Sequence, residues 1–467
     1  MPLKFFNTAQ RRVEVFEPLA DGQVSMYCCG PTVYNYAHIG NLRTYLFEDF
    51  LRRALEYLGF QVHHVMNVTD VGHLSDDGDE GEDKMLKGAR ERGMSVWEIA
   101  KFFSDAFFKD SERLAILRPT VVCPATQHID SMIALIQRLE EKGFTYLAGG
   151  NVYFDTSKFP QYGKMALLDR QEASGVSRVS YDQNKKNSRD FVLWFTKSKF
   201  ESQAMLWDSP WGRGYPGWHV ECSAMSMKYL GERFDIHCGG IDHVSVHHTN
   251  EIAQSEGAIG HPWVHYWLHG EFLLLSKEKM SKSTGEFLTL QSLIDQGYDP
   301  LDYRWFCLGA HYRSPLTFST EGLDGARNAR NNLNEKVLGW KKSAEPQKLG
   351  KEGLDYRTRW IAALENDLAL PQALSVVWAV VKDASLSPGE KLTLLYEMDK
   401  VLGMGWETLT EDKSDSVPAE ILSLIEDRQA ARQKKDWARS DAVREKLKLL
   451  GWTVEDSPAG PIPKRIV

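Results

Sequence analysis

The chain has 467 residues, of which 42% are hydrophobic and 26% charged, with a net charge of −8. This length exceeds what one hydrophobic core supports, so we expect three or four globular domains. The apolar runs are far shorter than the roughly 20 residues that span a bilayer, and the first residues lack the layout of a signal peptide, which predicts no membrane partner and a cytoplasmic location. Six cysteines are too few for a disulfide framework, so we expect free thiols. The acidic balance disfavours nucleic-acid binding by the chain as a whole, but it permits a local basic face.

The first part of the chain has the pattern of a β-α-β unit. An apolar strand is expected over Gly22–Tyr27, an amphipathic helix from about Leu42 to Leu58, and a second strand over Gln61–Asn67. Two strands joined by a helix are typical of a parallel sheet with helices on both faces. We therefore predict an α/β fold in which residues 1–120 form the first half of a Rossmann-like catalytic domain. Neither the dinucleotide fingerprint nor the Walker A sequence is present.

The pattern changes over residues 121–206, where a helix at Met132–Lys142 and a strand at Asn151–Phe154 precede a polar stretch. We interpret this part as an insertion that splits the sheet domain. The sheet pattern resumes in residues 207–287 with a strand at Phe234–His237, followed by another helix.

The remaining chain is mostly helical. We predict a stem-contact region over residues 288–322, a helical bundle over 323–407 and a small C-terminal α/β domain over 408–467. In that last domain, we expect one helix over Ala419–Leu450 and a strand over Trp452–Glu455.

Four residues form a candidate metal site. His247 and Glu251 are four residues apart, so on a helix they share a face and can bind one ion. Cys29 ends the apolar run Val24–Cys29, which is typical of a buried strand, and Cys222 ends the segment Trp218–Cys222. Two thiolates, an imidazole and a carboxylate are an ordinary zinc ligand set. The spacing also fits a structural alternative, in which His247 is a core-edge histidine and the cysteines are small buried apolar residues.

Two short motifs stand where phosphate chemistry would need them. His38 and Asn41 flank Gly40 at a strand-to-helix turn, and a helix N-terminus attracts anions. Gly40 leaves room for a nucleotide to approach, while His38 and Asn41 can donate hydrogen bonds to phosphate oxygens. Lys279 and Lys282, in a segment rich in Ser and Gly, can clamp the charge of a triphosphate. Each motif alone also fits a capped helix start or a solvated loop.

Taken together, these segments resemble the class I aminoacyl-tRNA synthetases, and within that class the cysteinyl-tRNA synthetases. His38–Asn41 and Lys279–Ser283 are similar to the two signatures of the class. The segments similar to the cysteinyl family are Met26–Tyr34, Pro216–Met225 and His247–Ser255. The resemblance covers essentially the whole chain, including the C-terminal Lys434–Ala438.

The resemblance implies the site residues. The implied zinc ligands are Cys29, Cys222, His247 and Glu251. The implied contacts of the substrate cysteine are Cys29, Thr69, Trp218 and His219. The implied ATP-binding residues are His38, Gly40, Asn41, Asp242, Lys279 and Lys282, with His38, Asn41 and the two lysines catalytic and Mg²⁺ bound with ATP. Whether Cys238 or His243 assists the metal stays open.

The implied activity is the activation of L-cysteine with ATP and its transfer to tRNA(Cys), with zinc selecting the thiolate and the enzyme acting as a monomer. Two alternatives remain: a cysteine ligase of the mycothiol type, which hands cysteine to an amino sugar, and a non-catalytic tRNA-binding paralogue. For the anticodon, we expect contacts from Arg432, Trp437 and Asp441, the last two sharing a helix face in a basic segment. The alternative for Trp437 is that it packs the core of its own small domain.

Overall fold

The computed structural model describes residues 2–71, 85, 89–90, 92–168, 182–197, 205–275, 288–410, 419–434, 436–450, 452–457 and 460–465, and every structural statement below refers to them. At the centre lies a five-stranded sheet whose strands are all parallel, in the order β11-β10-β3-β4-β5. Its strands are β3 (Gln23–Cys28), β4 (Gln61–Val68), β5 (Val121–Pro124), β10 (Phe234–Gly240) and β11 (Val264–Gly270). Read from β5 to β11 and counted along the chain, this order is third, second, first, fourth, fifth, which is that of the first five strands of a doubly wound sheet. The predicted Rossmann-like α/β fold is confirmed.

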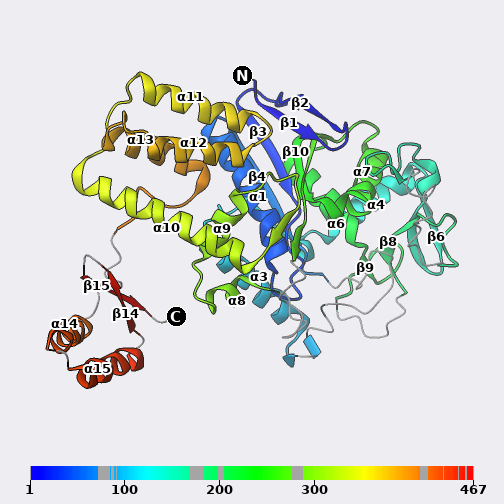
Figure 1. Cartoon of the computed structure of the whole chain (residues 1–467). Coiled ribbons are helices and arrows are strands. Elements are labelled where there is room, and N and C mark those ends of the chain that lie inside the picture. Colours follow the sequence, from blue (N-terminus) through cyan, green and yellow to red (C-terminus); the bar gives the residue numbers. More distant parts are fainter. Residues whose placement is uncertain are drawn as a thin grey trace.

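Helices cover both faces of this sheet (Figure 1). They are α1 (Ile39–Tyr57), α3 (Val96–Arg113), α4 (Ile129–Glu141), α6 (Trp218–Leu230) and α7 (His247–Ile259). On one face, Leu46 of α1 and Phe107 of α3 pack in a core with Met26 of β3. On the other face, Tyr27 of β3 packs with residues of α4, α6 and α7, including Val220. Because side chains alternate along a strand, neighbouring Met26 and Tyr27 serve opposite cores.

The helices that follow the neighbouring strands β3 and β10 lie on opposite faces of the sheet. After β3 the chain turns to α1 on one face, and after β10 it passes through the short helix η3 (Ile241–Val244) to α7 on the other. The carboxyl ends of the two strands stay together, since Cys238 pairs with Cys28 and the N–H of Cys29 donates to the carbonyl of Cys238 at 3.2 Å. In open α/β sheets, ligands bind in the crevice at this point.

A four-stranded antiparallel sheet lies beside the central domain, in the order β6-β7-β8-β9 (Figure 1). Its strands are β6 (Thr145–Ala148), β7 (Asn151–Phe154), β8 (Phe191–Phe195) and β9 (Tyr215–Pro216), accompanied by the short helices η1 (Ala125–Gln127) and η2 (Thr156–Lys158). It interrupts the central sheet between β5 and β10, as an insertion would. The domain limits at residues 120 and 206 stay a prediction.

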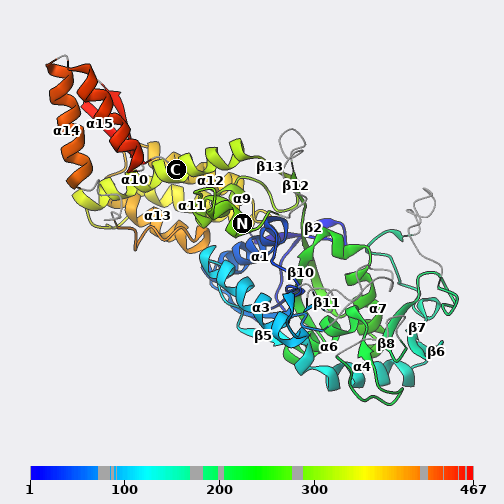
Figure 2. The same cartoon turned by 90° about the horizontal axis from the view of Figure 1, so that it is seen from below.

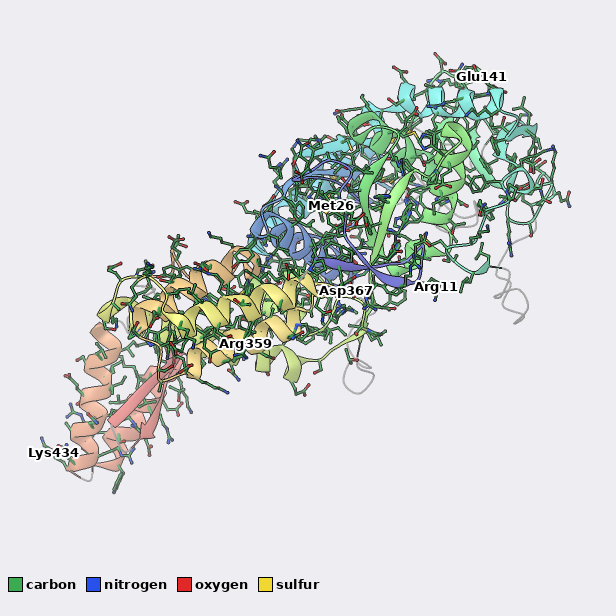
Figure 3. The ribbon with its side chains drawn as sticks, turned by 90° about the horizontal axis from the view of Figure 1, so that it is seen from above. Arg11, Met26, Glu141, Arg359, Asp367 and Lys434 are labelled. Carbon is green, nitrogen blue, oxygen red and sulfur yellow. The ribbon has the colours of Figure 1, made fainter. Side chains whose placement is uncertain are left out.

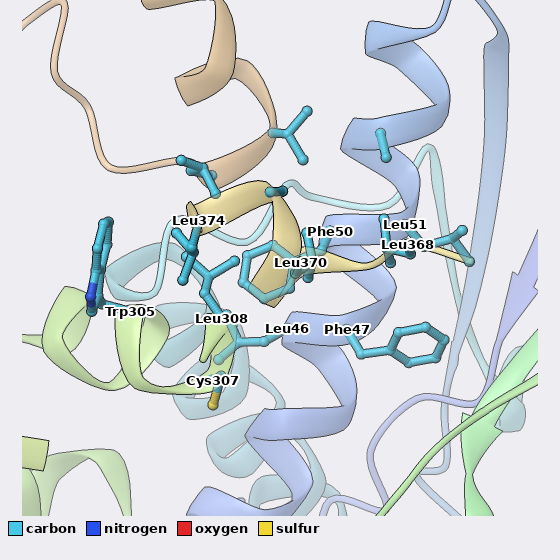
Figure 4. Packing of buried hydrophobic residues seen from close by; sticks show 14 of the residues in the cluster. Leu46, Phe47, Phe50, Leu51, Trp305, Cys307, Leu308, Leu368, Leu370 and Leu374 are labelled. Atoms are coloured by element: carbon cyan, nitrogen blue, oxygen red, sulfur yellow. The ribbon is translucent and has the colours of Figure 1, made fainter. Parts of the chain in front are cut away.

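A helical region follows, made of α8 (Leu290–Ile294), α9 (Pro300–Leu308), α10 (Thr320–Ser343), α11 (Lys351–Glu365), α12 (Leu370–Lys382) and α13 (Pro388–Leu402). Leu308 of α9 and Leu370 of α12 pack against Leu46 and Phe50 of α1 (Figure 4). In the same interface, a fully buried ion pair joins Arg304 to Asp49 of α1 at 2.6 Å. Two short pairs of strands complete this part: β1 (Lys4–Asn7) with β2 (Arg12–Val15), and β12 (Leu273–Leu275) with β13 (Leu316–Phe318).

The C-terminal unit lies at the far end of the molecule from the insertion (Figure 2), and Figure 3 shows Lys434 and Glu141 at opposite extremes. It consists of α14 (Ala419–Gln433), α15 (Trp437–Leu449), β14 (Trp452–Ser457) and β15 (Gly460–Arg465). The prediction of one helix over residues 419–450 is wrong, because α14 ends at Gln433 and a new helix starts at Trp437. The Asp436 side chain accepts from the N–H of Arg439 at 3.1 Å and so caps α15. None of the described helices is long and apolar enough to cross a membrane.

Candidate active site and metal centre

A cavity of about 350 Å³ lies in the crevice between the ends of β3 and β10. Residues far apart in the sequence meet in its wall, and the predicted site residues among them are Cys29, His38, Asn41, Thr69, Trp218, Cys222, Asp242 and His247. Asp242 reaches the wall from η3 and Thr69 from just after β4. The structure therefore brings the first phosphate motif and the metal candidates to one place.

The N-terminus of α1 forms one side of this cavity. The helix begins at Ile39, three residues before the predicted start, because His38 caps it. His38 Nδ1 accepts from the N–H of Asn41 at 3.2 Å, and Asn41 Oδ1 accepts from the N–H of His38 at 3.3 Å. A Cβ on Gly40 would stand 2.9 Å from the His38 ring, so glycine is needed for this cap.

The cap also decides which hydrogen His38 can offer. Burial lowers the pKa of the His38 imidazole, outweighing the opposite effect of Asp242, so the ring is neutral near pH 7. A neutral ring whose Nδ1 accepts a hydrogen bond carries its proton on Nε2. In this arrangement Nε2–H is the group that His38 can donate to a phosphate oxygen.

The four metal candidates form a compact donor set. Their ligand atoms lie within 4.8 Å of one another, and all four residues, Cys29, Cys222, His247 and Glu251, are buried. His247 Nε2 lies 2.9 Å from Glu251 Oε1, one helical turn along α7, as the spacing predicts. The outer nitrogen of His247, Nδ1, lies 2.9 Å from Nδ1 of His219, a second contact of the kind that orients metal-ligating histidines. The sulfur, nitrogen and oxygen donors fit a zinc ion in number and type.

The charges of this set are strongly coupled. Burial raises the pKa of the Cys29 thiol well above its ordinary value. Burial also acts to raise the pKa of Cys222, but hydrogen bonds with Cys29 and His247 outweigh it and bring that pKa below the usual range. Burial works against ionised Glu251 too, yet the charges of His237 and His247 lower its pKa to about 2. The site thus favours ionised Cys222 and Glu251, whereas the Cys29 thiol has to release its proton when a metal cation binds.

Thr69 and Trp218, which line the cavity, are held in place by neighbouring side chains. Thr69 accepts a hydrogen bond from Asn67 Nδ2 at 3.0 Å and donates one to Glu221 Oε2, also at 3.0 Å. Trp218 lies against His247 with ring centroids 4.8 Å apart. Glu221, which is fully buried, was not predicted. The sequence feature that could have pointed to Glu221 is its position next to Cys222, in a helix whose neighbouring residues are mostly buried.

A second group of buried histidines was also missed by sequence reasoning. His237 Nε2 lies 2.9 Å from Glu251 Oε2, and His248 Nε2 lies 3.3 Å from the sulfur of Cys29. Seven of the chain's 14 histidines fall between residues 237 and 269, and this density was the signal that could have found them. Among the described residues, neither Cys238 nor His243 belongs to a group of possible metal ligands, although His243 lines the cavity.

Lys279 and Lys282 fall outside the described residues. Arg432, Trp437 and Asp441 are exposed in the C-terminal unit, with Asp441 paired to Arg444 at 3.4 Å. Trp437 is 59% exposed, so it does not pack the core of this unit. Its role at the anticodon stays a prediction.

Two family models match this chain, one over its first two thirds and one near its C-terminus. Residues 15–328 match the family described as "tRNA synthetases class I (C) catalytic domain". Residues 414–460 match the family described as "Cysteinyl-tRNA ligase anticodon binding domain". The two matches together include the cavity and the C-terminal unit up to the start of β15.

Whole proteins of known name are similar over nearly the full chain. The cysteine–tRNA ligase of Treponema denticola is 52% identical, with 98% of each chain covered. Cysteine–tRNA ligase 1 of Burkholderia lata is 48% identical, with 98% of this chain and 96% of the relative covered. The cysteine–tRNA ligase of Borrelia hermsii is 46% identical over the whole of both chains.

Solved structures show the same fold at low sequence identity. A methionyl-tRNA synthetase of Mycobacterium tuberculosis in complex with methionyl-adenylate has a TM-score of 0.54 at 15% identity, covering 82% of this chain and 90% of its own. A leucyl enzyme of Agrobacterium radiobacter in a ternary complex with tRNA has a TM-score of 0.56 at 11% identity, covering 83% of this chain and 84% of its own. The fold, the matched domains and the full-length similarity together show that the chain belongs to the cysteine–tRNA ligases, a family of class I aminoacyl-tRNA synthetases.

Proposed function

We propose that this chain activates L-cysteine with ATP and transfers it to the 3′ end of tRNA(Cys). The observation that carries the proposal is the single cavity in which the phosphate motif at the start of α1 faces a donor set with two thiols. The match to an anticodon-binding domain supports tRNA as the acceptor. The match to an anticodon-binding domain argues against the amino-sugar ligase, and the complete set of candidate metal ligands argues against the non-catalytic paralogue.

In the first step, the carboxylate of cysteine attacks the α-phosphate of ATP, and pyrophosphate leaves. This chemistry needs no side-chain nucleophile, so positioning and stabilisation of negative charge do the catalysis. His38 Nε2–H and the Nδ2 amide of Asn41 are the donors from α1, since their other polar atoms form the helix cap. Lys279 and Lys282 would neutralise the triphosphate, and Mg²⁺ would accompany ATP. A ribose hydroxyl of the 3′-terminal adenosine of tRNA then attacks the carbonyl carbon of the adenylate, which forms the ester and releases AMP.

Selection of cysteine over serine would fall to the metal centre. Cys29, Cys222, His247 and Glu251 would hold one Zn²⁺, which when bound favours a thiolate over a hydroxyl and lowers the pKa of a coordinated thiol. An apolar pocket alone separates such near-isosteres poorly. Thr69 would receive the substrate's ammonium group, because its hydroxyl, already bonded to Asn67 and Glu221, keeps one acceptor position for an N–H donor.

Binding of tRNA would extend from the helical region to the C-terminal unit. The proposed domains for this task are residues 323–407 and 408–467, with residues 288–322 as the link from the cavity. The distance of the C-terminal unit from the central sheet suits a long RNA that is read at one end and charged at the other (Figure 2). The cytoplasmic location and the monomeric state stay predictions.

Two assays on the purified enzyme test the proposal. Exchange of radiolabelled pyrophosphate into ATP should depend on L-cysteine and proceed far more slowly with L-serine. Charging of total tRNA with radiolabelled cysteine should then label one acceptor tRNA. Exchange without any charging would refute tRNA as the acceptor, and absence of cysteine-dependent exchange would refute the activity itself.

A further inference from the structure

The donor set of the metal centre has a neighbour that shares half of its residues. Cys29 and Glu251 belong to two groups of possible ligands, one completed by Cys222 and His247 and the other by His237 and His248. We call them the outer position and the inner position. All ligand atoms of the inner position also lie within 4.8 Å of one another, and all four residues are buried.

The distances in the inner position suit a metal ion. His248 Nε2 lies 3.3 Å from Cys29 Sγ and 3.9 Å from Glu251 Oε1, and Cys29 Sγ lies 3.9 Å from the same oxygen. Tetrahedral ligand atoms that stand 2.0–2.3 Å from zinc are separated from one another by roughly 3.3–3.8 Å. His237 Nε2 and Glu251 Oε2, at 2.9 Å, need to move apart by only a few tenths of an ångström.

Both inner histidines are held as metal ligands usually are. Nδ1 of His237, the ring nitrogen that faces away from the donor set, lies 3.3 Å from the carbonyl oxygen of Cys238. Nδ1 of His248 lies 2.7 Å from His269 Nε2, and His269 Nδ1 lies 2.8 Å from the hydroxyl of Thr8. Such contacts fix the ring and turn its Nε2 toward the ion. The structure thus holds both rings in the ligating orientation.

The two positions differ in their access to substrate. Cys222 and His247, which complete the outer position, line the cavity. Of the inner ligands only Cys29 lines the cavity, while His237, His248 and Glu251 are fully buried, so the inner position is the more covered of the two. One thiolate and one carboxylate also cancel the charge of a divalent cation, which makes the inner position suitable for a site away from water. Both positions have four protein ligands, but only the outer one has three of them in the cavity wall, where its ion could take a substrate thiolate as a further ligand.

We propose that the inner residues, Cys29, His237, His248 and Glu251, form a second binding position for a divalent transition-metal ion such as zinc. Two divalent ions would face only three anionic ligands, Cys29, Cys222 and Glu251, in a buried site, so we expect one position to be filled at a time. An ion in the inner position is out of reach of L-cysteine, so the enzyme in that state lacks its selective group. The inference rests on the metal centre proposed above and adds a covered, inactive resting place for the same ion.

The test uses full-length apoenzyme reloaded with Co²⁺, whose absorption reports thiolate ligands, together with X-ray absorption to count sulfur neighbours. Wild type should bind about one equivalent with two sulfur ligands, and its spectrum should shift when L-cysteine is added. Cys222→Ser/His247→Gln, which lacks the outer position, should still bind about one equivalent, now with one sulfur, and its spectrum should not respond to L-cysteine. Introducing His237→Gln into that variant should abolish binding.

Two controls keep the outcomes apart. Cys29→Ser removes a ligand of both positions and should bind no metal, while His237→Gln/His248→Gln should keep the two-sulfur, cysteine-responsive spectrum. If circular dichroism shows that the double outer variant does not fold, Cys222→Ala carries the same two measurements. An outer variant that folds but holds no cobalt, or whose spectrum responds to L-cysteine, overturns the inner position. A wild type without a two-sulfur spectrum would instead overturn the metal centre itself.

Discussion

The exposed Trp437 at the first position of α15 offers a direct test of how the C-terminal unit contacts RNA. Its side chain is 59% exposed, whereas the core of the unit is built from other buried residues, Ile421, Ile425, Val443, Leu447 and Trp452. Exposed aromatic rings stack on unpaired bases. We therefore expect Trp437→Ala to weaken tRNA binding and to leave the fold and the adenylation step intact.

The size of the effect follows from the exposure of the ring. Loss of one base–aromatic stack costs about 1–3 kcal/mol, which corresponds to about a 5-fold to 150-fold loss of kcat/KM for tRNA. Removing a ring that is mostly in water should change the free energy of unfolding by less than about 0.5 kcal/mol. Trp452→Ala is the matched control, since Trp452 is 6% exposed and its loss should cost about 3–5 kcal/mol.

Three measurements on each variant separate these outcomes. For Trp437→Ala, pyrophosphate exchange and the thermal transition by circular dichroism should match the wild type, while the KM for tRNA rises. Trp437→Phe keeps a ring and should recover a large part of the charging efficiency. Normal charging by Trp437→Ala would refute the stacking role, and so would a loss of pyrophosphate exchange that parallels the loss of charging.

Three further predictions concern the catalytic domain. Lys282→Ala should lower the rate constant of pyrophosphate exchange by about 10²-fold, as loss of one charge-stabilising donor does, with little change in the KM for cysteine; an unchanged rate constant would exclude a catalytic lysine there. Cys29→Ser should reduce metal content after dialysis from about one equivalent to less than about 0.1, measured by elemental analysis; retained metal would contradict both metal positions. His64 is buried without a side-chain hydrogen bond, and burial lowers its pKa to about 3, so only the unfolded chain binds its proton between pH 6.5 and about 3. Stability from this group is complete above pH 6.5 and falls by about 1.4 kcal/mol for each unit below it, about 2 kcal/mol at pH 5. His64→Gln should flatten this dependence in urea unfolding followed between pH 4 and 7, and an identical slope in both proteins would count against it.

Local patterns predicted much of the fold. The strands β3, β4, β7 and β10 and the helix α7 were expected from apolar runs and helical spacing near the observed bounds. The same-face pairing of His247 and Glu251 needed only the helical period, and the structure places their side chains 2.9 Å apart. Each of these features depends on residues within one or two turns of each other, which is the range over which sequence patterns act.

Other features depend on contacts that no local pattern contains. The early start of α1 comes from the reciprocal hydrogen bonds of His38 and Asn41, and the break before α15 from the cap at Asp436. A side chain that can cap a helix can equally face solvent, so the sequence alone does not show which polar residue ends or starts a helix. The predicted helix bounds therefore missed both caps. The density of histidines marks the stretch that holds His237 and His248, but their meeting with Cys29 and Glu251 depends on the pairing of β10 with β3 and on the packing of α7.

The meeting of phosphate chemistry and thiol chemistry in one cavity follows from strand order. The first βα turn, after β3, supplies Cys29 and the capped start of α1, while the turn after β10 supplies Asp242 and leads to His247. These turns are adjacent only because the fourth strand of the sheet pairs with the first, which places both carboxyl ends beside each other. Cys29 connects these features. Its N–H donates to the carbonyl of Cys238 in β10, its sulfur belongs to both metal positions, and its side chain lines the cavity. A shift of the β3–β10 register by one residue would turn Cys29 to the opposite face of the sheet and remove the metal centre while leaving the phosphate motif in place.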